Sequence, residues 1–385
     1  MRTFLYIGSF CPGGPAGYSV YSFEEESGSA ELISDSLFPE ISAGTAVFDE
    51  ERRILYATDE RPGNPAFLKG GGGRVFALRA DPESGLLSRL DETLSYGARP
   101  SFAAIDPEKK YLLVTNFGAS KHAGIPVTRV RKDQGGNWGV FVEYEDASTA
   151  LIRLNPDGSF GVAADVLVHG QEGRPDPRIP HAHCVKRSPD GNLFAVCEMG
   201  TDSIYMLKID RENGKILVQS GAPYRYHEGY GPRYCAFHPE IPFFFVNAED
   251  VPAVTSFRYD ADGNLEEICT VNVMPEGEEP VPELQSGFAM SHDGRFLYSA
   301  MRKYDLLNVF SVDQETGQLK NIQTFPLSGE HPKDCALSPG GRYLAVTCRR
   351  SGYAELLRVT EDGTVSSAGL RIPRKDAGCV FFLKG

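Results

Sequence analysis

The 385-residue sequence has no apolar run near the ~20 residues that a membrane-spanning helix requires, which excludes such a helix. The N-terminus has one basic residue, a short apolar run and no small-residue cleavage site. We therefore expect it to be the first strand of a cytoplasmic protein, not a signal peptide. Basic residues are also in deficit, with 39 against 52 acidic ones and a net charge of −13. Proteins that bind the nucleic-acid backbone usually have the opposite balance, so we expect neither a nucleic-acid nor a membrane partner.

Several motifs with known chemistry are also missing. The eight cysteines form no Cys-x-x-Cys pair, and most lie in apolar runs such as Ala195–Cys197, as expected for buried, reduced thiols. No Gly-x-Ser-x-Gly elbow is present, which disfavours serine-esterase chemistry. The run Gly70–Gly73 precedes a strand-like segment and not a helix, so it resembles a connecting turn more than a phosphate cradle.

What the sequence does contain is a repeat. A Pro/Asp/Gly turn followed by a short aliphatic and aromatic run occurs six times. The copies are Asp49–Glu60, Asp106–Asn116, Ser188–Glu198, His238–Glu249, Ser291–Arg302 and Ser338–Arg349. A second phrase, a strand followed by a turn with glycine, lies between them. It ends at Gly28, Gly85, Gly158, Gly214, Gly263, Gly317 and Gly363.

Short alternating strands with a turn signal about every ten residues predict antiparallel sheet, and seven repeats predict the blades of a β-propeller. The segment Phe4–Ser9 supplies the seventh copy of the first phrase, and Gly378–Leu383 supplies a strand before it. We therefore expect residues 1–385 to form a single all-β, seven-bladed propeller, closed by pairing of the N- and C-terminal strands. Two packed sandwiches would not explain one repeat running through the whole chain.

One segment, from about 119 to 144, interrupts the repeat and contains the only tryptophan, Trp138. A long insertion between propeller strands is either a lid over the axis or an elaboration of the surface. The sequence favours the surface elaboration slightly.

Propeller geometry selects candidate functional residues. The innermost strand of each blade and its antiparallel neighbour place the start of the first and the end of the second at one face of the ring. Starts of inner strands supply Arg99, Ser101, His181, His183, Arg233, Lys333 and Asp334. Ends of the neighbouring strands supply Glu60, Asn116, Glu198, Glu249, Arg302 and Arg349. Such charged groups indicate either a small-molecule site or ion pairs that join the blades. If they form a small-molecule site, we expect them to contribute little to the apolar cores, whereas ion pairs that join the blades would contribute to stability.

The pair His181 and His183 could in principle bind a metal ion, since residues i and i+2 of a strand share a face. No third soft ligand is evident, although Glu198 or Glu249 could serve. General acid/base chemistry fits the histidines better, because their ordinary pKa lies near neutrality. We therefore expect neither a metal nor another cofactor.

These phrases together resemble the seven-bladed propeller lactonases, which include 6-phosphogluconolactonases and carboxymuconate lactonising enzymes. The resemblance is densest in Pro180–Val185 and Gly231–Pro239, and it extends over most of the chain. It implies acid/base chemistry on a lactone, with site residues that match His183, Arg233 and Glu249 by motif. Arg302 matches by its place at a strand end. The stretch His331–Cys335 departs from the family pattern, because Lys333 stands where a Pro-Arg-His phrase is usual.

The leading hypothesis is a metal-independent hydrolase that opens a sugar-acid lactone. His183 or Glu249 would take a proton from water, while Arg233 and Arg302 would hold the oxyanion or an anionic group of the substrate. Further substrate contacts are expected from His181, Glu198, Glu60 and Asn116. The expected partner is a small lactone or anionic sugar acid. The alternatives are an intramolecular lyase that cyclises an unsaturated diacid and a propeller that only binds a partner.

Overall fold

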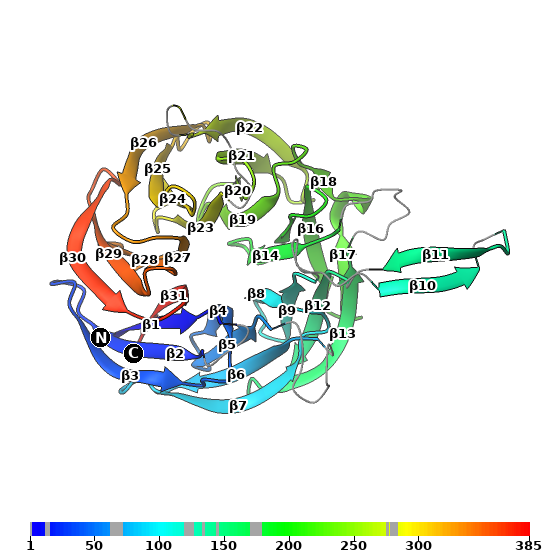
Figure 1. Ribbon diagram of the computed structural model, residues 1–385, viewed down its shortest axis with the longest axis horizontal. Coiled ribbons are helices and arrows are strands. Elements are labelled where there is room, and N and C mark those ends of the chain that lie inside the picture. The colour runs from blue at the N-terminus through cyan, green and yellow to red at the C-terminus, as the bar shows by residue number, and fades with distance from the viewer. Residues whose placement is uncertain are drawn as a thin grey trace.

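The computed structural model describes residues 2–385 except 12–15, 62–71, 119–126, 133–134, 144–145, 170–178, 275–276 and 278–283 (Figure 1). Seven antiparallel sheets surround a common axis as the blades of a propeller. Among the described residues, the only helical element is the short 3-10 turn η1 (Gln219–Gly221). The predicted all-β, seven-bladed fold is therefore confirmed.

The first four blades each place four strands in order from the axis outward. Blade 1 contains β31 (Ala377–Lys384), β1 (Thr3–Ser9), β2 (Tyr18–Phe23) and β3 (Ala30–Leu37). Blade 2 contains β4 (Ala43–Asp49), β5 (Ile54–Asp59), β6 (Arg74–Ala80) and β7 (Leu87–Leu94). Blade 3 contains β8 (Pro100–Ile105), β9 (Tyr111–Asn116), β12 (Ser148–Leu154) and β13 (Phe160–Val168). Blade 4 contains β14 (Ala182–Arg187), β15 (Phe194–Glu198), β16 (Ser203–Asp210) and β17 (Lys215–Val218), with β18 (Tyr224–Arg225) also pairing with β16.

The other three blades follow the same plan. Blade 5 contains β19 (Pro232–Phe237), β20 (Phe243–Ala248), β21 (Ala253–Tyr259) and β22 (Leu265–Asn272). Blade 6 contains β23 (Gln285–Met290), β24 (Phe296–Met301), β25 (Leu306–Val312) and β26 (Leu319–Pro326). Blade 7 contains β27 (Pro332–Leu337), β28 (Tyr343–Cys348), β29 (Tyr353–Val359) and β30 (Val365–Pro373).

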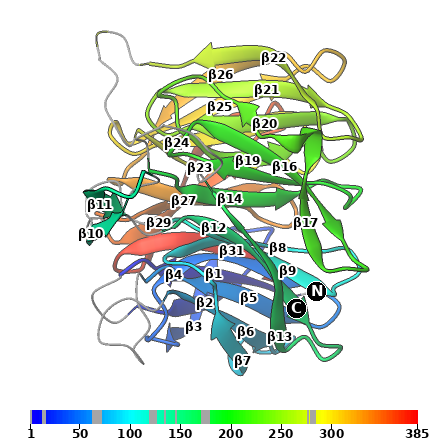
Figure 2. The same ribbon diagram turned by 90° about the vertical axis from the view of Figure 1, so that its right-hand side faces the viewer.

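The ring closes within blade 1. Its innermost strand, β31, pairs antiparallel with β1 from Thr3 opposite Lys384 to Ser9 opposite Ala377, as the sequence predicted. The two chain termini consequently lie beside each other in both views (Figures 1 and 2). Joining the first and last strands in one blade ties the two ends of the chain into the ring.

The recurring glycines explain how neighbouring blades fit together. All seven hairpin glycines named above have a positive φ, a conformation that residues with a Cβ adopt at a cost. At Gly85 a Cβ would stand 2.5 Å from Cδ1 of Phe4 in the preceding blade, and Gly363 meets Phe296 in the same way. An aromatic residue of the first phrase thus packs against the glycine of the second phrase one blade further on at several interfaces, whereas Gly263 meets Met206 and Gln219. The two phrases recur together because they meet at these contacts between blades.

The predicted insertion is a β-hairpin in its described part, formed by β10 (Val127–Lys132) and β11 (Trp138–Glu143). Residues 119–126, 133–134 and 144 of this segment lie outside the described residues, as do Gly70 and Gly71 of the glycine run. The hairpin projects away from the ring (Figure 1), and Trp138 is 72% exposed. The described strands thus elaborate the surface and do not cover the axis.

Candidate active site

A β-bulge interrupts the pairing of the inner two strands in every blade. In blade 4, Ala182 pairs with Glu198 and Cys184 with Cys197, so His183 is the extra residue. Arg233 is the extra residue of blade 5. The bulge of blade 7 contains Lys333 and Asp334, and the other four contain Gly44 and Thr45, Ser101, Ser286 and Gly287, and Gly378. A bulge redirects a side chain out of the regular alternation, so these positions can hold polar groups within otherwise apolar strands.

The residue that follows the second strand of each blade lies next to the bulge. Its backbone N–H donates to the carbonyl just before the inner strand, as from Glu249 to Gly231 (2.7 Å) and from Arg302 to Leu284 (2.7 Å). The seven equivalent residues are Phe10, Glu60, Phe117, Met199, Glu249, Arg302 and Arg349. We call this end of the ring the bulge end, and the opposite end, where the first two strands are joined by turns, the turn end.

Three of the predicted catalytic residues form one ion-pair cluster at the bulge end. Nε of Arg233 donates to Oε2 of Glu249 (2.6 Å), and Nη2 of Arg302 lies 3.1 Å from Oε1 of Glu249. The three side chains are only 4%, 9% and 7% exposed for Arg233, Arg302 and Glu249. The guanidinium carbon of Arg233 also lies 4.5 Å from the centre of the Tyr234 ring. One carboxylate therefore orients two guanidinium groups in a poorly solvated place, where charged hydrogen bonds are strong.

The fourth, His183 of blade 4, lies against aromatic rings of the blades on either side. Its ring centre is 5.3 to 5.8 Å from those of Phe102, Phe117 and Tyr234. Burial, followed by the charges of Arg233 and other cations nearby, holds the pKa of His183 well below its usual value. The imidazole is therefore neutral at neutral pH, the form that can accept a proton.

Two buried atoms of this group make no hydrogen bond within the described part of the chain. They are Nδ1 of His183 and Nη1 of Arg233. A buried polar atom without a partner is costly, and in a native structure it often marks a place where a ligand binds. Here one atom belongs to a base and the other to a cationic donor.

His181 and Glu60 also lie at the bulge end. The His181 ring stacks on Phe117 (4.3 Å between centres), and its Nδ1 lies 3.1 Å from the Phe117 carbonyl oxygen. Since a carbonyl only accepts, Nδ1 of His181 carries the proton. Glu60 lies 3.6 Å from the ammonium nitrogen of Lys333. The described residues contain no group of three or more His, Cys, Asp or Glu side chains suited to hold a metal ion.

Asn116 and Glu198 do not join this cluster in the structure. The Glu198 carboxylate accepts hydrogen bonds from the backbone N–H groups of His181, Gly200 (2.9 Å) and Thr201 (3.0 Å), and it is fully buried. Asn116 is also fully buried and donates from Nδ2 to the Ser95 carbonyl (2.8 Å). Both are the last residues of their strands, one position before the seven residues defined above. Because successive side chains of a strand point to opposite faces, this one-residue offset directs them into backbone contacts within the fold.

Burial also corrects the expectation that the charged residues contribute little to stability. Arg233 and Glu249 are 3% and 5% exposed, so their ion pair is part of the packed interior. Removing one member of such a pair leaves a buried charge without compensation and destabilises a protein strongly.

The sequence selects Lys333 and Arg349 as candidates but assigns them no role in the site. It does not select Phe10, which lies beside both. The ammonium nitrogen of Lys333 lies 3.9 Å, and the guanidinium carbon of Arg349 4.7 Å, from the centre of the Phe10 ring. The register could have found Phe10, because it follows β1 as Glu249 follows β20. An aromatic residue at the end of an apolar run carries no other signal.

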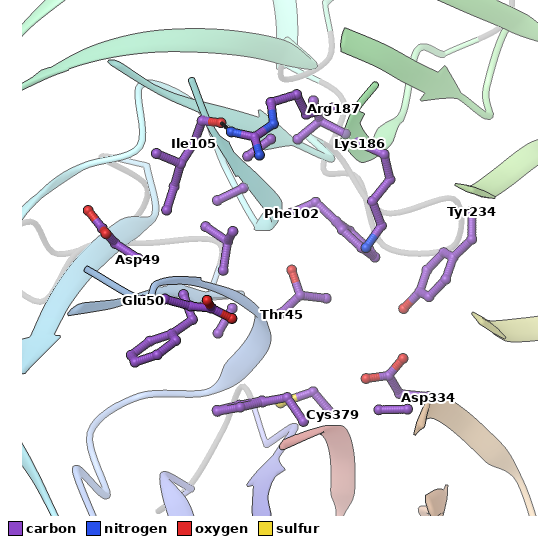
Figure 3. Close-up of a pocket in the computed structure, with 18 of the residues that line it drawn as sticks. Thr45, Asp49, Glu50, Phe102, Ile105, Lys186, Arg187, Tyr234, Asp334 and Cys379 are labelled. Carbon is purple, nitrogen blue, oxygen red and sulfur yellow. Dashed lines mark hydrogen bonds between the residues drawn. The ribbon is translucent and has the colours of Figure 1, made fainter. Parts of the chain in front are cut away.

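A cavity of about 900 Å³ lies toward the turn end, lined by the inner strands of all seven blades (Figure 3). The Asp334 carboxylate, the Tyr234 hydroxyl and the Lys186 amine point into it. None of the eight predicted site residues lines it. Phe102 and Tyr234 line the cavity and also contact His183, so these rings separate the cavity from the bulge-end cluster.

Comparison with known proteins bears on this arrangement. A family profile described as "Lactonase, 7-bladed beta-propeller" matches residues 4–382. The chain belongs to this family. A lactonase-family relative from Bacillus subtilis, named 6-phosphogluconolactonase, is 26% identical over 98% of this chain and 97% of its own length. A 6-phosphogluconolactonase from Formosa agariphila is 23% identical over 92% of each chain.

A solved structure shares the fold. The periplasmic gluconolactonase of Pseudomonas aeruginosa superimposes with a TM-score of 0.82, at 22% identity, over 100% of this chain and 99% of that one. Among the described residues, no helix has the length and apolar character needed to cross a membrane.

Proposed function

We propose that this protein hydrolyses a sugar-acid lactone by acid/base catalysis at the bulge end of the ring. Membership of the lactonase family supports the reaction type, and the names of the two sequence relatives support the class of substrate. The observation that carries the proposal is the pair of buried, unpartnered atoms on His183 and Arg233. One can accept a proton, and the other can donate to a developing oxyanion.

In the proposed reaction, Nδ1 of His183 takes a proton from a water molecule as its oxygen attacks the lactone carbonyl carbon. The carbonyl oxygen becomes an oxyanion, which Arg233 and Arg302 stabilise by charge and hydrogen bonding. When the intermediate collapses, the bond from the carbonyl carbon to the ring oxygen breaks. The imidazolium of His183 returns its proton to that oxygen, which leaves an open-chain hydroxy acid and the neutral histidine.

His183 is better placed than Glu249 to act as the base in this arrangement. Each oxygen of the Glu249 carboxylate already faces a guanidinium group, whereas Nδ1 of His183 has no hydrogen-bond partner among the described residues. Glu249 instead holds the two arginines in place, which makes it a positioning residue. His183 lies beside the arginines with a free ring nitrogen.

The geometry of the cluster disfavours a diacid cyclase in which Arg233 and Arg302 anchor separate carboxylates. A cyclase of that kind would use the two arginines as separate anchors for two carboxylates. Here both guanidinium groups converge on the single carboxylate of Glu249 and so form one positive site. One positive site matches one oxyanion.

The test is lactone turnover by purified wild-type protein and His183→Ala, followed by acid release and corrected for spontaneous hydrolysis. We expect His183→Ala to lose about 10²–10⁴-fold in rate, the usual contribution of a general acid or base. Arg233→Lys should also lose activity, because an ammonium group cannot reproduce the geometry of a guanidinium. His227→Ala is the matched control, since His227 is a partly exposed histidine paired with Glu267. Unchanged turnover in His183→Ala would overturn the catalytic assignment, and turnover of an unsaturated diacid instead of a lactone would favour the cyclase.

The cytoplasmic location remains part of the proposal. It is supported by eight cysteines that are all unpaired, six of them buried, as suits a reducing compartment.

A further inference from the structure

Residues of blades 7, 1 and 2 form a second charged cluster at the bulge end, across the ring from blades 4 to 6. It consists of Lys333 and Arg349 from blade 7, Phe10 from blade 1 and Glu60 from blade 2. Phe10, Glu60 and Arg349 occupy the same position in their blades as Glu249 does in blade 5, and Lys333 is a bulge residue like Arg233. The two clusters therefore face one another by the symmetry of the repeat. The proposed reaction leaves this second cluster without a role.

Its two cations are held close together without being neutralised at short range. Both lie within 5 Å of the Phe10 ring centre, at 3.9 and 4.7 Å, so they can be separated by no more than the sum of these distances. Each forms a long ion pair with a carboxylate: Glu60 is 3.6 Å from Lys333, and Asp376 is 3.9 Å from Arg349. The corresponding contact between Arg233 and Glu249 is 2.6 Å.

Lys333 in particular has unused donors. Its side chain is only 12% exposed, and its ammonium group makes no hydrogen bond to any described residue. Burial lowers the pKa of Lys333, and Glu60 opposes that effect. The charge of Lys333 in turn contributes to the lowered pKa of His183, so the two clusters interact electrostatically. An ammonium group in this state favours an oxyanion with several acceptor oxygens.

We infer that Lys333, with Arg349, binds a phosphate group at the end of the substrate remote from the lactone carbonyl. This inference rests on the proposed function, because it places the reacting carbonyl at Arg233 and Arg302 and the phosphate across the ring. Lys333 is then a residue that determines specificity for a phosphorylated over a neutral sugar lactone. Phe10 holds the ammonium group of Lys333 by cation–π contact.

The test compares 6-phosphogluconolactone with gluconolactone on wild-type protein, Lys333→Met and Lys333→Arg. Loss of a charge-assisted hydrogen bond should reduce kcat/KM for the phosphorylated lactone by about 10–100-fold in Lys333→Met, mainly through KM. The neutral lactone should change by less than about threefold, and Lys333→Arg should retain most of the preference because it keeps the charge. Lys186→Met, which removes an amine at the turn-end cavity, is the matched control and should leave both substrates unaffected.

An equal loss for both lactones in Lys333→Met would overturn the subsite and assign Lys333 a general structural role. No loss for either would overturn it as well. Calorimetric binding of 6-phosphogluconate, measured without turnover, separates the subsite from the reaction. Binding that weakens in Lys333→Met, in a protein that hydrolyses no lactone, would uphold the subsite and overturn the proposed hydrolysis.

Discussion

Replacing Glu249 by glutamine removes the negative charge that lies between two guanidinium groups, with little change in side-chain shape. The carboxylate is 2.6 Å from Arg233 and 3.1 Å from Arg302. Breaking a buried ion pair by removing one partner costs about 3–5 kcal/mol. Glutamine keeps one oxygen that can accept from one arginine, so we expect Glu249→Gln to lower the free energy of unfolding by about 3 kcal/mol, the lower end of that range.

The measurement is urea unfolding at neutral pH followed by circular dichroism. Fluorescence of the single tryptophan is unsuitable, because Trp138 is exposed on the projecting hairpin and not in the ring. The matched control is Glu266→Gln, an exposed carboxylate on β22 of the same blade, which should change stability by no more than about 0.5 kcal/mol. Equal losses in the two variants would refute the argument that the cluster is a buried, energetically coupled ion pair.

A double variant tests directly whether Glu249 and Arg302 interact. In Glu249→Gln the charge of Arg302 lacks its carboxylate, so adding Arg302→Gln should cost less than it does in the wild type. Side chains in one ion-pair network typically show coupling of about 0.5–3 kcal/mol. Strictly additive losses would show that Glu249 and Arg302 do not interact in the folded protein.

Three further predictions concern the fold. Burial lowers the pKa of His169 to about 3, below the ~6.5 of an unfolded chain, so the unfolded state alone gains this proton as pH falls. Between pH 7 and 5 the wild type should therefore lose about 2 kcal/mol more stability than His169→Gln, measured by urea unfolding; equal losses would contradict it. Thiol titration of native protein should find at most two rapidly reacting cysteines, Cys11 and Cys269, because the other six are buried; four or more would contradict the fold. Deleting residues 378–385 should destabilise strongly, since it removes the partner of β1, and an unchanged melting temperature would count against ring closure.

The sequence predicted the ring because the repeat encodes contacts between blades as well as strands. The aromatic residues and glycines that mark the two phrases touch across several blade interfaces, as Phe4 and Gly85 do. The repeated residues therefore indicated contacts between blades as well as the strands themselves. The repeat also predicted that the C-terminal strand closes the ring by pairing with the N-terminal strand, because no other blade lacked a strand.

The site was predicted less completely, and the failures have a common cause. Asn116 and Glu198 end their strands, whereas Glu249 and Arg302 follow theirs. Strand boundaries inferred from a sequence are uncertain by more than one residue, and one residue is enough to turn a side chain to the opposite face. Aligning the six copies by their internal residues would have paired Asn116 with Ala248 and Glu198 with Met301, and so exposed the offset.

The bulges explain why catalytic and structural residues are hard to separate in this fold. In four blades the bulge holds small residues, and in three of these a hydroxyl donates to a backbone carbonyl of the next blade, as from Ser101 to His183 (2.6 Å). In three blades it holds His183, Arg233 or Lys333. The same backbone irregularity therefore joins blades at some positions and presents reactive groups at others. A substitution such as Ser101→Ala should change the position of the His183 side chain, although Ser101 does not contact the substrate. The chemistry at the bulge end therefore depends on the residues that shape the bulges as well as on those that bear charge.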